Sequence, residues 1–151
     1  MFRIQVLTPP VTNTHGWLEA GARLNLGPER FLFVVDLQHW SVADYERQWR
    51  DGTRRILHGA TSTALMTAYS GVDAHSHHMW ALWRDEDHLY AQQHSIITDE
   101  LDAPFDPETP YEHVGERINA SRHDLPIREW RVNLIDVYAA AMGIRWPLCS
   151  Y

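Results

Sequence analysis

The chain has 151 residues and a formal net charge of −7, which argues against a general affinity for nucleic acid because that affinity comes from cations that neutralise phosphates. A chain of this length forms one domain with its own core, since it buries roughly 68–70% of its unfolded surface. It shows no signal peptide, no apolar run near the ~18 residues of a membrane span and only one cysteine, Cys149, so we expect a cytoplasmic protein without an internal disulfide.

The first third of the chain predicts strands. Phe2, Ile4 and Val6 alternate with polar residues up to the Pro9-Pro10 break, which is typical of a half-buried strand. The segments 22–26 and 31–35 flank a turn-like Gly27-Pro28-Glu29-Arg30 and predict a hairpin. Because the second segment is apolar almost throughout, we expect a central strand that is covered on both faces.

A helix is predicted from about 41 to 58. Ser41 is a good N-cap with acidic Asp44 three residues on, apolar residues recur at helical spacing, and Gly59 supplies a left-handed stop. The opposite face is charged and is interpreted as solvated. Arg50 and Arg54 lie four residues apart on it, a spacing at which like charges repel by a few tenths of a kcal/mol.

The middle of the chain predicts an antiparallel meander. Residues 62–69 are strand-like, 70–73 form a turn, and 79–84 pair with 88–97 across Asp85-Glu86-Asp87. Alternation places Trp80 and Leu82 on one face and Ala81 and Trp83 on the other. Either face could hold the core, so the pattern leaves open which tryptophan is exposed.

The segment from Asp99 to Asp124 is interpreted as a loop. Its prolines remove amide donors and its many carboxylates favour solvent, so we expect a stiff, acidic and exposed segment. Trp130, Val132 and Leu134 then alternate as a last strand, before a short helix at 135–142 that ends at Gly143. The whole pattern predicts an α+β fold, a single domain over 1–151 that is mainly antiparallel sheet with one main helix.

Catalytic and metal-binding patterns are weak. His75-Ser-His77-His78 has three imidazoles in four residues, and His88 or His94 could approach it across the hairpin. No cysteine and no His-Glu-x-x-His helix completes a zinc site, so we interpret the cluster as an exposed polar loop without a metal. No nucleophile elbow or phosphate-binding glycine loop is present, so we expect no enzyme and no cofactor. The alternative is a small metal-dependent or acid/base hydrolase that uses His75, His77 and His94.

Aromatic and acidic residues instead indicate a protein that works by binding. Rigid aromatic rings offer contact area and carboxylates offer charge complementarity to a basic partner. Together with a few basic and turn residues, they follow one another along the chain in this order: Asp36 to Trp40, Tyr45, Gln48-Trp49, Arg54 or Arg55 with Gly59, Trp80-Ala-Leu-Trp-Arg84, Tyr90-Ala-Gln-Gln93, Pro104-Phe-Asp-Pro107, Pro110-Tyr111, Arg117, Glu129-Trp130 and Asp136.

In this order the chain resembles the immunity proteins of bacterial contact-dependent growth inhibition systems, and in particular the group whose toxin partners include pancreatic-ribonuclease-like nucleases. The resemblance covers about 36–136, and Arg128 departs from it where a small hydroxyl residue is expected. It implies a cytoplasmic antitoxin that binds the C-terminal toxin domain of the cognate exoprotein in a 1:1 complex and blocks its active site. It implies no cofactor and no catalysis, while the net charge and the lack of a long apolar run predict no nucleic-acid and no membrane partner.

A nuclease presents a positively charged cleft to phosphates, so an acidic inhibitor can occupy that cleft and gain a steered association rate. We therefore expect toxin contacts from the two acidic segments and from an exposed face of the 80–93 hairpin. The candidate toxin-binding residues are Asp85, Glu86, Asp87, Asp102, Asp106, Glu108, Trp80 and Trp83.

Overall fold

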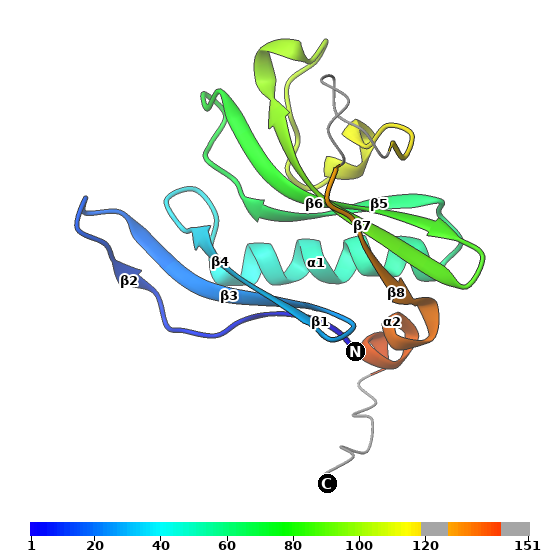
Figure 1. The fold of residues 1–151 in the computed structure, drawn as a ribbon. Coiled ribbons are helices and arrows are strands. Elements are labelled where there is room, and N and C mark those ends of the chain that lie inside the picture. The colour runs from blue at the N-terminus through cyan, green and yellow to red at the C-terminus, as the bar shows by residue number, and fades with distance from the viewer. Residues whose placement is uncertain (119–126, 143–151) are drawn as a thin grey trace, which may run out of the picture.

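The computed structural model describes residues 1–118 and 127–142, and its elements form two four-stranded antiparallel sheets and two α-helices (Figure 1). Sheet A contains β1 (Phe2–Val6), β2 (Val11–Thr12), β3 (Leu18–Leu26) and β4 (Glu29–Asp36). Sheet B has the order β5 (Ser62–Ala68), β6 (Ser76–Asp85), β7 (His88–Ile97) and β8 (Trp130–Asn133). The helices are α1 (Val42–Leu57) and α2 (Leu134–Ala141), and two short 3-10 turns lie at Thr98–Glu100 and Pro110–His113.

The predicted α+β class is confirmed, and so is the main helix. Ser41 caps α1 as expected: its hydroxyl accepts a hydrogen bond from the Asp44 amide at 3.2 Å, and the Asp44 carboxylate accepts one from the Ser41 amide at 2.9 Å. This reciprocal box satisfies two of the donors that a helix N-terminus leaves free. Arg50 and Arg54, the like charges four residues apart, lie on the solvent side of the helix, while Tyr45, Trp49 and Ile56 are buried.

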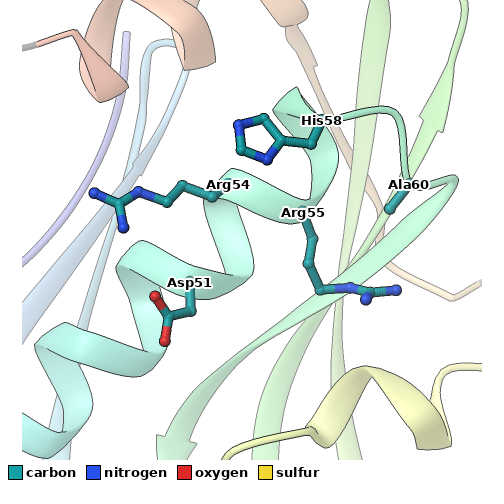
Figure 2. A pocket seen from close by; sticks show the side chains of 5 residues that line it. All are labelled: Asp51, Arg54, Arg55, His58 and Ala60. Carbon is teal, nitrogen blue, oxygen red and sulfur yellow. The ribbon is translucent and has the colours of Figure 1, made fainter.

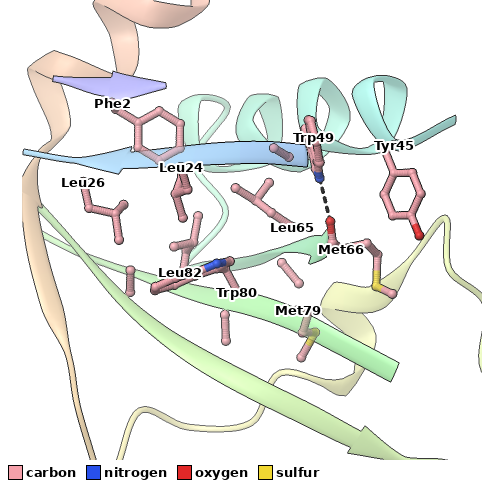
Figure 3. Packing of buried hydrophobic residues seen from close by; sticks show 14 of the residues in the cluster. Phe2, Leu24, Leu26, Tyr45, Trp49, Leu65, Met66, Met79, Trp80 and Leu82 are labelled. Carbon is pink, nitrogen blue, oxygen red and sulfur yellow. Dashed lines mark hydrogen bonds between the residues drawn. The ribbon is translucent and has the colours of Figure 1, made fainter. Parts of the chain in front are cut away.

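Helix α1 runs between the two sheets and closes the free edge of β5 (Figure 1). The buried Gln48 amide donates to the Ala64 carbonyl at 2.8 Å and accepts from the Met66 amide at 2.8 Å. The Trp49 indole N–H then donates to the Met66 carbonyl at 2.6 Å (Figure 3). Side chains of a helix thus replace the hydrogen bonds of a neighbouring strand at this edge of sheet B.

Gly52 permits this close approach. A Cβ atom added there would lie 2.6 Å from the Ala64 carbonyl oxygen, which is too short for any real contact. The Gly52 carbonyl also accepts a hydrogen bond from the Thr63 hydroxyl at 2.7 Å. The residue acts through its small size, because only a glycine lets the helix backbone touch the strand.

The core lies where sheet A, α1 and the inner face of sheet B meet (Figure 3). Trp80 is 1% exposed and packs against Phe31 of β4 and Trp130 of β8, with ring centroids 5.1 and 5.4 Å apart. The Tyr45 hydroxyl joins the sheets by donating to the Asp36 carbonyl at 2.7 Å and accepting from the Tyr69 amide at 3.0 Å.

The prediction of a central, doubly covered strand at 31–35 is wrong. β4 pairs only with β3 and is therefore an edge strand. Its odd residues Phe31, Phe33 and Val35 face the core, whereas Leu32 is 75% and Val34 is 54% exposed. A continuous apolar run does not require two covered faces, because folded proteins leave much apolar surface in water.

The last strand ends one residue earlier than predicted. Leu134, predicted as the end of the last strand, is instead the first residue of α2, and β8 ends at Asn133. The predicted loop after Asp99 forms no strand, and only short 3-10 turns appear in it up to residue 118. The predicted loop residues 119–124, the helix stop at Gly143 and Cys149 lie outside the described residues.

Replacing Gln48 tests whether α1 holds the edge of sheet B. Gln48→Met keeps the side-chain length but leaves a buried amide and a buried carbonyl of β5 without partners. We expect it to lower the free energy of unfolding by about 2–4 kcal/mol in urea titrations, with an unchanged m-value. The matched control is Gln93→Met at an exposed position of β7, which should change stability by less than about 0.5 kcal/mol. Equal effects of the two substitutions would contradict the edge-closing role.

Candidate functional site

The first acidic segment is a rigid turn. Asp85 pairs with His88 across the β6–β7 hairpin, and Glu86 takes a left-handed backbone conformation with φ of 53°. The Asp87 carbonyl accepts a hydrogen bond from the Leu134 amide at 2.8 Å, which ties the turn to the start of α2. Asp85, Glu86 and Asp87 are all exposed, as expected. The turn therefore presents three carboxylates at a fixed place.

The second acidic segment belongs to a loop that packs across the outer face of sheet B. Phe105 stacks on His77 with centroids 4.6 Å apart, and the Trp83 indole donates to the Gly115 carbonyl at 2.9 Å. The loop thus covers the side of β6 that faces away from α1 (Figure 1). Its acidic residues Asp102, Asp106 and Glu108 are exposed, as expected.

Glu108 differs from the other candidates because it is paired. It forms an ion pair with Arg47 of α1, and Arg47 also binds Asp44 at 3.0 Å. The hydrogen bond that Arg47 donates to the Glu108 carboxylate raises the pKa of the Arg47 guanidinium. Among the described residues, Asp102 and Asp106 take part in no ion pair. Glu108 therefore fastens the loop to the helix, and Asp102 and Asp106 carry the uncompensated charge.

The structure separates the two acidic segments. The turn at 85–87 precedes β7 and the acidic loop follows it, so the turn and the start of the loop lie at opposite ends of a ten-residue strand that is about 30 Å long. The sequence order did not show this separation, because strand length had to be known first.

Neither candidate tryptophan is available at the surface. Trp80 is 1% and Trp83 is 7% exposed, because the core covers one face of β6 and the acidic loop covers the other. The sequence left open which face of this strand is buried, and in the structure both faces are buried at these positions. The sequence predicted an exposed aromatic face on this hairpin, but these two positions do not provide one.

A hollow of about 390 Å³ lies at the end of α1, lined by Asp51, Arg54, Arg55, His58 and Ala60 (Figure 2). The Arg55 guanidinium lies 3.5 Å from the centroid of the Tyr111 ring and so holds the loop in place. Figure 2 shows Arg54 extending in the opposite direction, toward sheet A. The hollow contains none of the candidate residues and no serine, threonine or cysteine that could act as a nucleophile.

The histidine cluster is not the exposed loop that the sequence predicted. His77 lies in β6, is 1% exposed and sits between Tyr69 and Phe105, while its Nδ1 accepts from the Ser70 amide at 3.2 Å. His75 and His78 are exposed. The reason is strand alternation, which turns His77 inward under the loop and His78 outward. Within residues 1–118 and 127–142 no group of three possible ligands could hold a metal ion.

A comparison with known protein families identifies the family of this chain. A model of the CdiI N-terminal domain matches residues 35–140. The chain belongs to this family. The match confirms the resemblance to immunity proteins of contact-dependent growth inhibition. A search of curated proteins found no match, and no helix of the described residues has the length and apolar character to cross a membrane.

One solved structure shares the fold of this CdiI-family chain. It is described as the CdiA-CT/CdiI toxin and immunity complex from Enterobacter cloacae and superposes with a TM-score of 0.85 at 21% sequence identity. The match covers 95% of this chain and 98% of that chain. The two chains thus share one architecture over nearly their whole length.

Several residues that carried the family resemblance prove to be structural. Arg117 binds Glu129 with Nε–Oε2 at 2.7 Å, lies over the Tyr90 ring at 3.6 Å, and lowers the pKa of the Glu129 carboxyl. Gln92 donates to the same carboxylate at 2.8 Å. In this CdiI-family protein the network fixes the end of the acidic loop against β7, and the sequence order gave no sign of it.

The buried histidines predict a pH-dependent stability. Burial lowers the pKa of His77 and of His94 in the folded protein. As the pH falls below about 6.5, the histidine pKa in the unfolded chain, the unfolded chain therefore binds more protons than the folded one. The contribution of these two neutral histidines to the free energy of unfolding is fully present above pH 6.5. Urea titrations should show the free energy of unfolding falling as the pH drops toward 5. His77→Gln should flatten this dependence, whereas His15→Gln at an exposed position outside sheet B should leave it as in the wild type. A pH-independent wild-type stability between 7.5 and 5 would contradict this expectation.

Proposed function

We propose that this protein is an immunity protein that binds the C-terminal toxin domain of a cognate contact-dependent growth inhibition exoprotein in the cytoplasm. Membership of the CdiI family carries the proposal. The fold shared with a chain of a solved toxin and immunity complex supports it. The protein acts by forming a 1:1 complex and needs no cofactor or catalytic group.

The toxin in this proposal is a nuclease, most simply a ribonuclease. The observation that favours it is the anchored acidic turn, in a chain of net charge −7. A rigid set of exposed carboxylates suits a phosphate-binding cleft, because it loses little conformational entropy when it binds and attracts the cleft over several ångströms. The alternative hydrolase gains no support: His77 is stacked between two rings and His94 lies against Trp83 with Nε2 3.0 Å from the Gln92 side chain.

The proposed function predicts protection by the protein itself. Co-expression with the toxin domain encoded next to it should restore growth, and calorimetry should show a 1:1 complex with a Kd in the nanomolar range or below, as for nuclease inhibitors of standard interface size. A catalytically inactive toxin variant serves as the binding partner and as the growth control. Full toxicity together with micromolar or absent binding would refute the immunity function.

The acidic segments predict a salt-dependent association rate. Glu86→Lys with Asp87→Lys, or separately Asp102→Lys with Asp106→Lys, should slow toxin association by about tenfold at low salt in stopped-flow measurements, because steering charges act mainly on the on-rate. The effect should shrink as salt shortens the Debye length, which is about 8 Å at physiological ionic strength. Glu108 is left unchanged because it holds the loop to Arg47.

The matched control reverses two exposed carboxylates elsewhere, Glu29→Lys with Asp51→Lys. It changes the net charge by the same amount but leaves both acidic segments intact. If both test variants associate at the control's rate across the salt series, the acidic segments are only solvated surface and the binding face lies elsewhere.

A further inference from the structure

A second cavity lies between β1 and the two helices, contains none of the candidate residues and shares only Arg54 with the hollow at the end of α1. Its volume is about 390 Å³, which falls in the range of ligand sites. Phe2, Ile4 and Trp49 form an apolar floor, and Ala140 and Ala141 at the end of α2 form one wall. The small alanine side chains keep the groove open.

The edge of β1 that borders this groove has free main-chain groups. The Leu7 amide donates to the Gly21 carbonyl of β3, so odd residues of β1 point their main-chain groups toward β3 and even residues point theirs away. Within the described residues, no hydrogen bond joins the outward amide or carbonyl of Ile4 to another group. Unlike β5, whose edge Gln48 closes, β1 is therefore able to pair with an added strand.

Arginines dominate the rim of the groove. Arg3, Arg50 and Arg54 line it against a single carboxylate, Glu46. All three arginines are exposed, and none forms an ion pair in the part of the chain that the structure describes. Arg50 and Arg54 repel each other at their four-residue spacing. A carboxylate bound between them would relieve that repulsion, and a guanidinium matches its geometry.

The groove is continuous with the acidic turn through α2. This helix begins at Leu134, whose amide is bonded to Asp87, and its eight residues end at the groove, about 12 Å away. A protein interface of standard size, about 800 Å² on each partner, spans both. Ile135 and Met142 of the same surface are 61% and 65% exposed, so apolar contact area lies between the two charged regions.

We propose that this groove receives an extended segment of the toxin domain that carries a carboxylate. The segment pairs with the free edge of β1, places an apolar side chain over Trp49, and sets its carboxylate between Arg50 and Arg54. This mode of recognition takes affinity from main-chain hydrogen bonds and specificity from side-chain pockets. The inference rests on the proposed function and adds to it the binding surface and the chemistry of the toxin segment.

Two variants of the full chain test the groove against the inactive linked toxin domain. Arg50→Gln with Arg54→Gln removes the carboxylate partners, and Ala141→Trp fills the groove without a charge change. Each should speed dissociation by about tenfold or more in surface plasmon resonance, since close pairs act mainly on the off-rate. The control, Arg30→Gln with Arg131→Gln, removes two exposed arginines outside the groove and should dissociate within twofold of the wild type.

Amide hydrogen exchange gives a readout that does not depend on substitution. In the complex with wild-type protein, exchange at the Ile4 amide should slow by about tenfold or more, as strand addition requires. If the wild type binds tightly while both groove variants dissociate normally and Ile4 stays unprotected, the groove inference is wrong and the immunity function stands. If the wild type does not bind the toxin at all, the proposed function fails and the groove inference fails with it.

Discussion

The Gln48 amide is the contact on which the arrangement of this molecule depends. By bonding Ala64 and Met66 it lets a helix, rather than another strand, complete the edge of sheet B. An exposed strand edge invites pairing with other chains, so closing it from within also prevents that pairing. The same helix packs Trp49 into the core on one side and holds Glu108 of the acidic loop through Arg47 on another. One helix therefore sets the distance between the sheets and the position of the loop.

Because β6 is covered on both faces around Trp80 and Trp83, its large aromatic residues serve stability and leave recognition to other parts of the chain. Trp80 fills the core and Trp83 holds the loop through Gly115. Partner contacts must then come from turns, loops and helix ends, where backbone position is fixed by a few specific hydrogen bonds. The Asp87 carbonyl bonded to Leu134 is such a bond. It turns a flexible hairpin tip into a site of defined geometry.

Local patterns in the sequence predicted the elements well but not what covers them. The Ser41–Asp44 capping box and the alternation in the meander depend on neighbours in the chain, and both were found where expected. The exposure of Leu32, the burial of His77 and the burial of both tryptophans depend on segments far away in the sequence. Signals for these existed: Phe105 and Tyr111 are aromatic among prolines and acids, and Gln48 is a polar residue on an apolar helix face. The separation of the acidic segments and the arginine groove required the fold itself.

The two ends of α2 give the proposed interface opposite charges, and this bears on specificity. A chain with net charge −7 attracts any cationic protein, so its overall charge alone cannot select one toxin. The acidic turn at one end of α2 favours a basic cleft, whereas Arg50 and Arg54 at the other end disfavour a uniformly basic surface by like-charge contact. A partner must present both signs at positions that match the two ends of α2, a helix about 12 Å long. General attraction thus governs encounter, and the arginine groove rejects cationic proteins that lack the matching carboxylate.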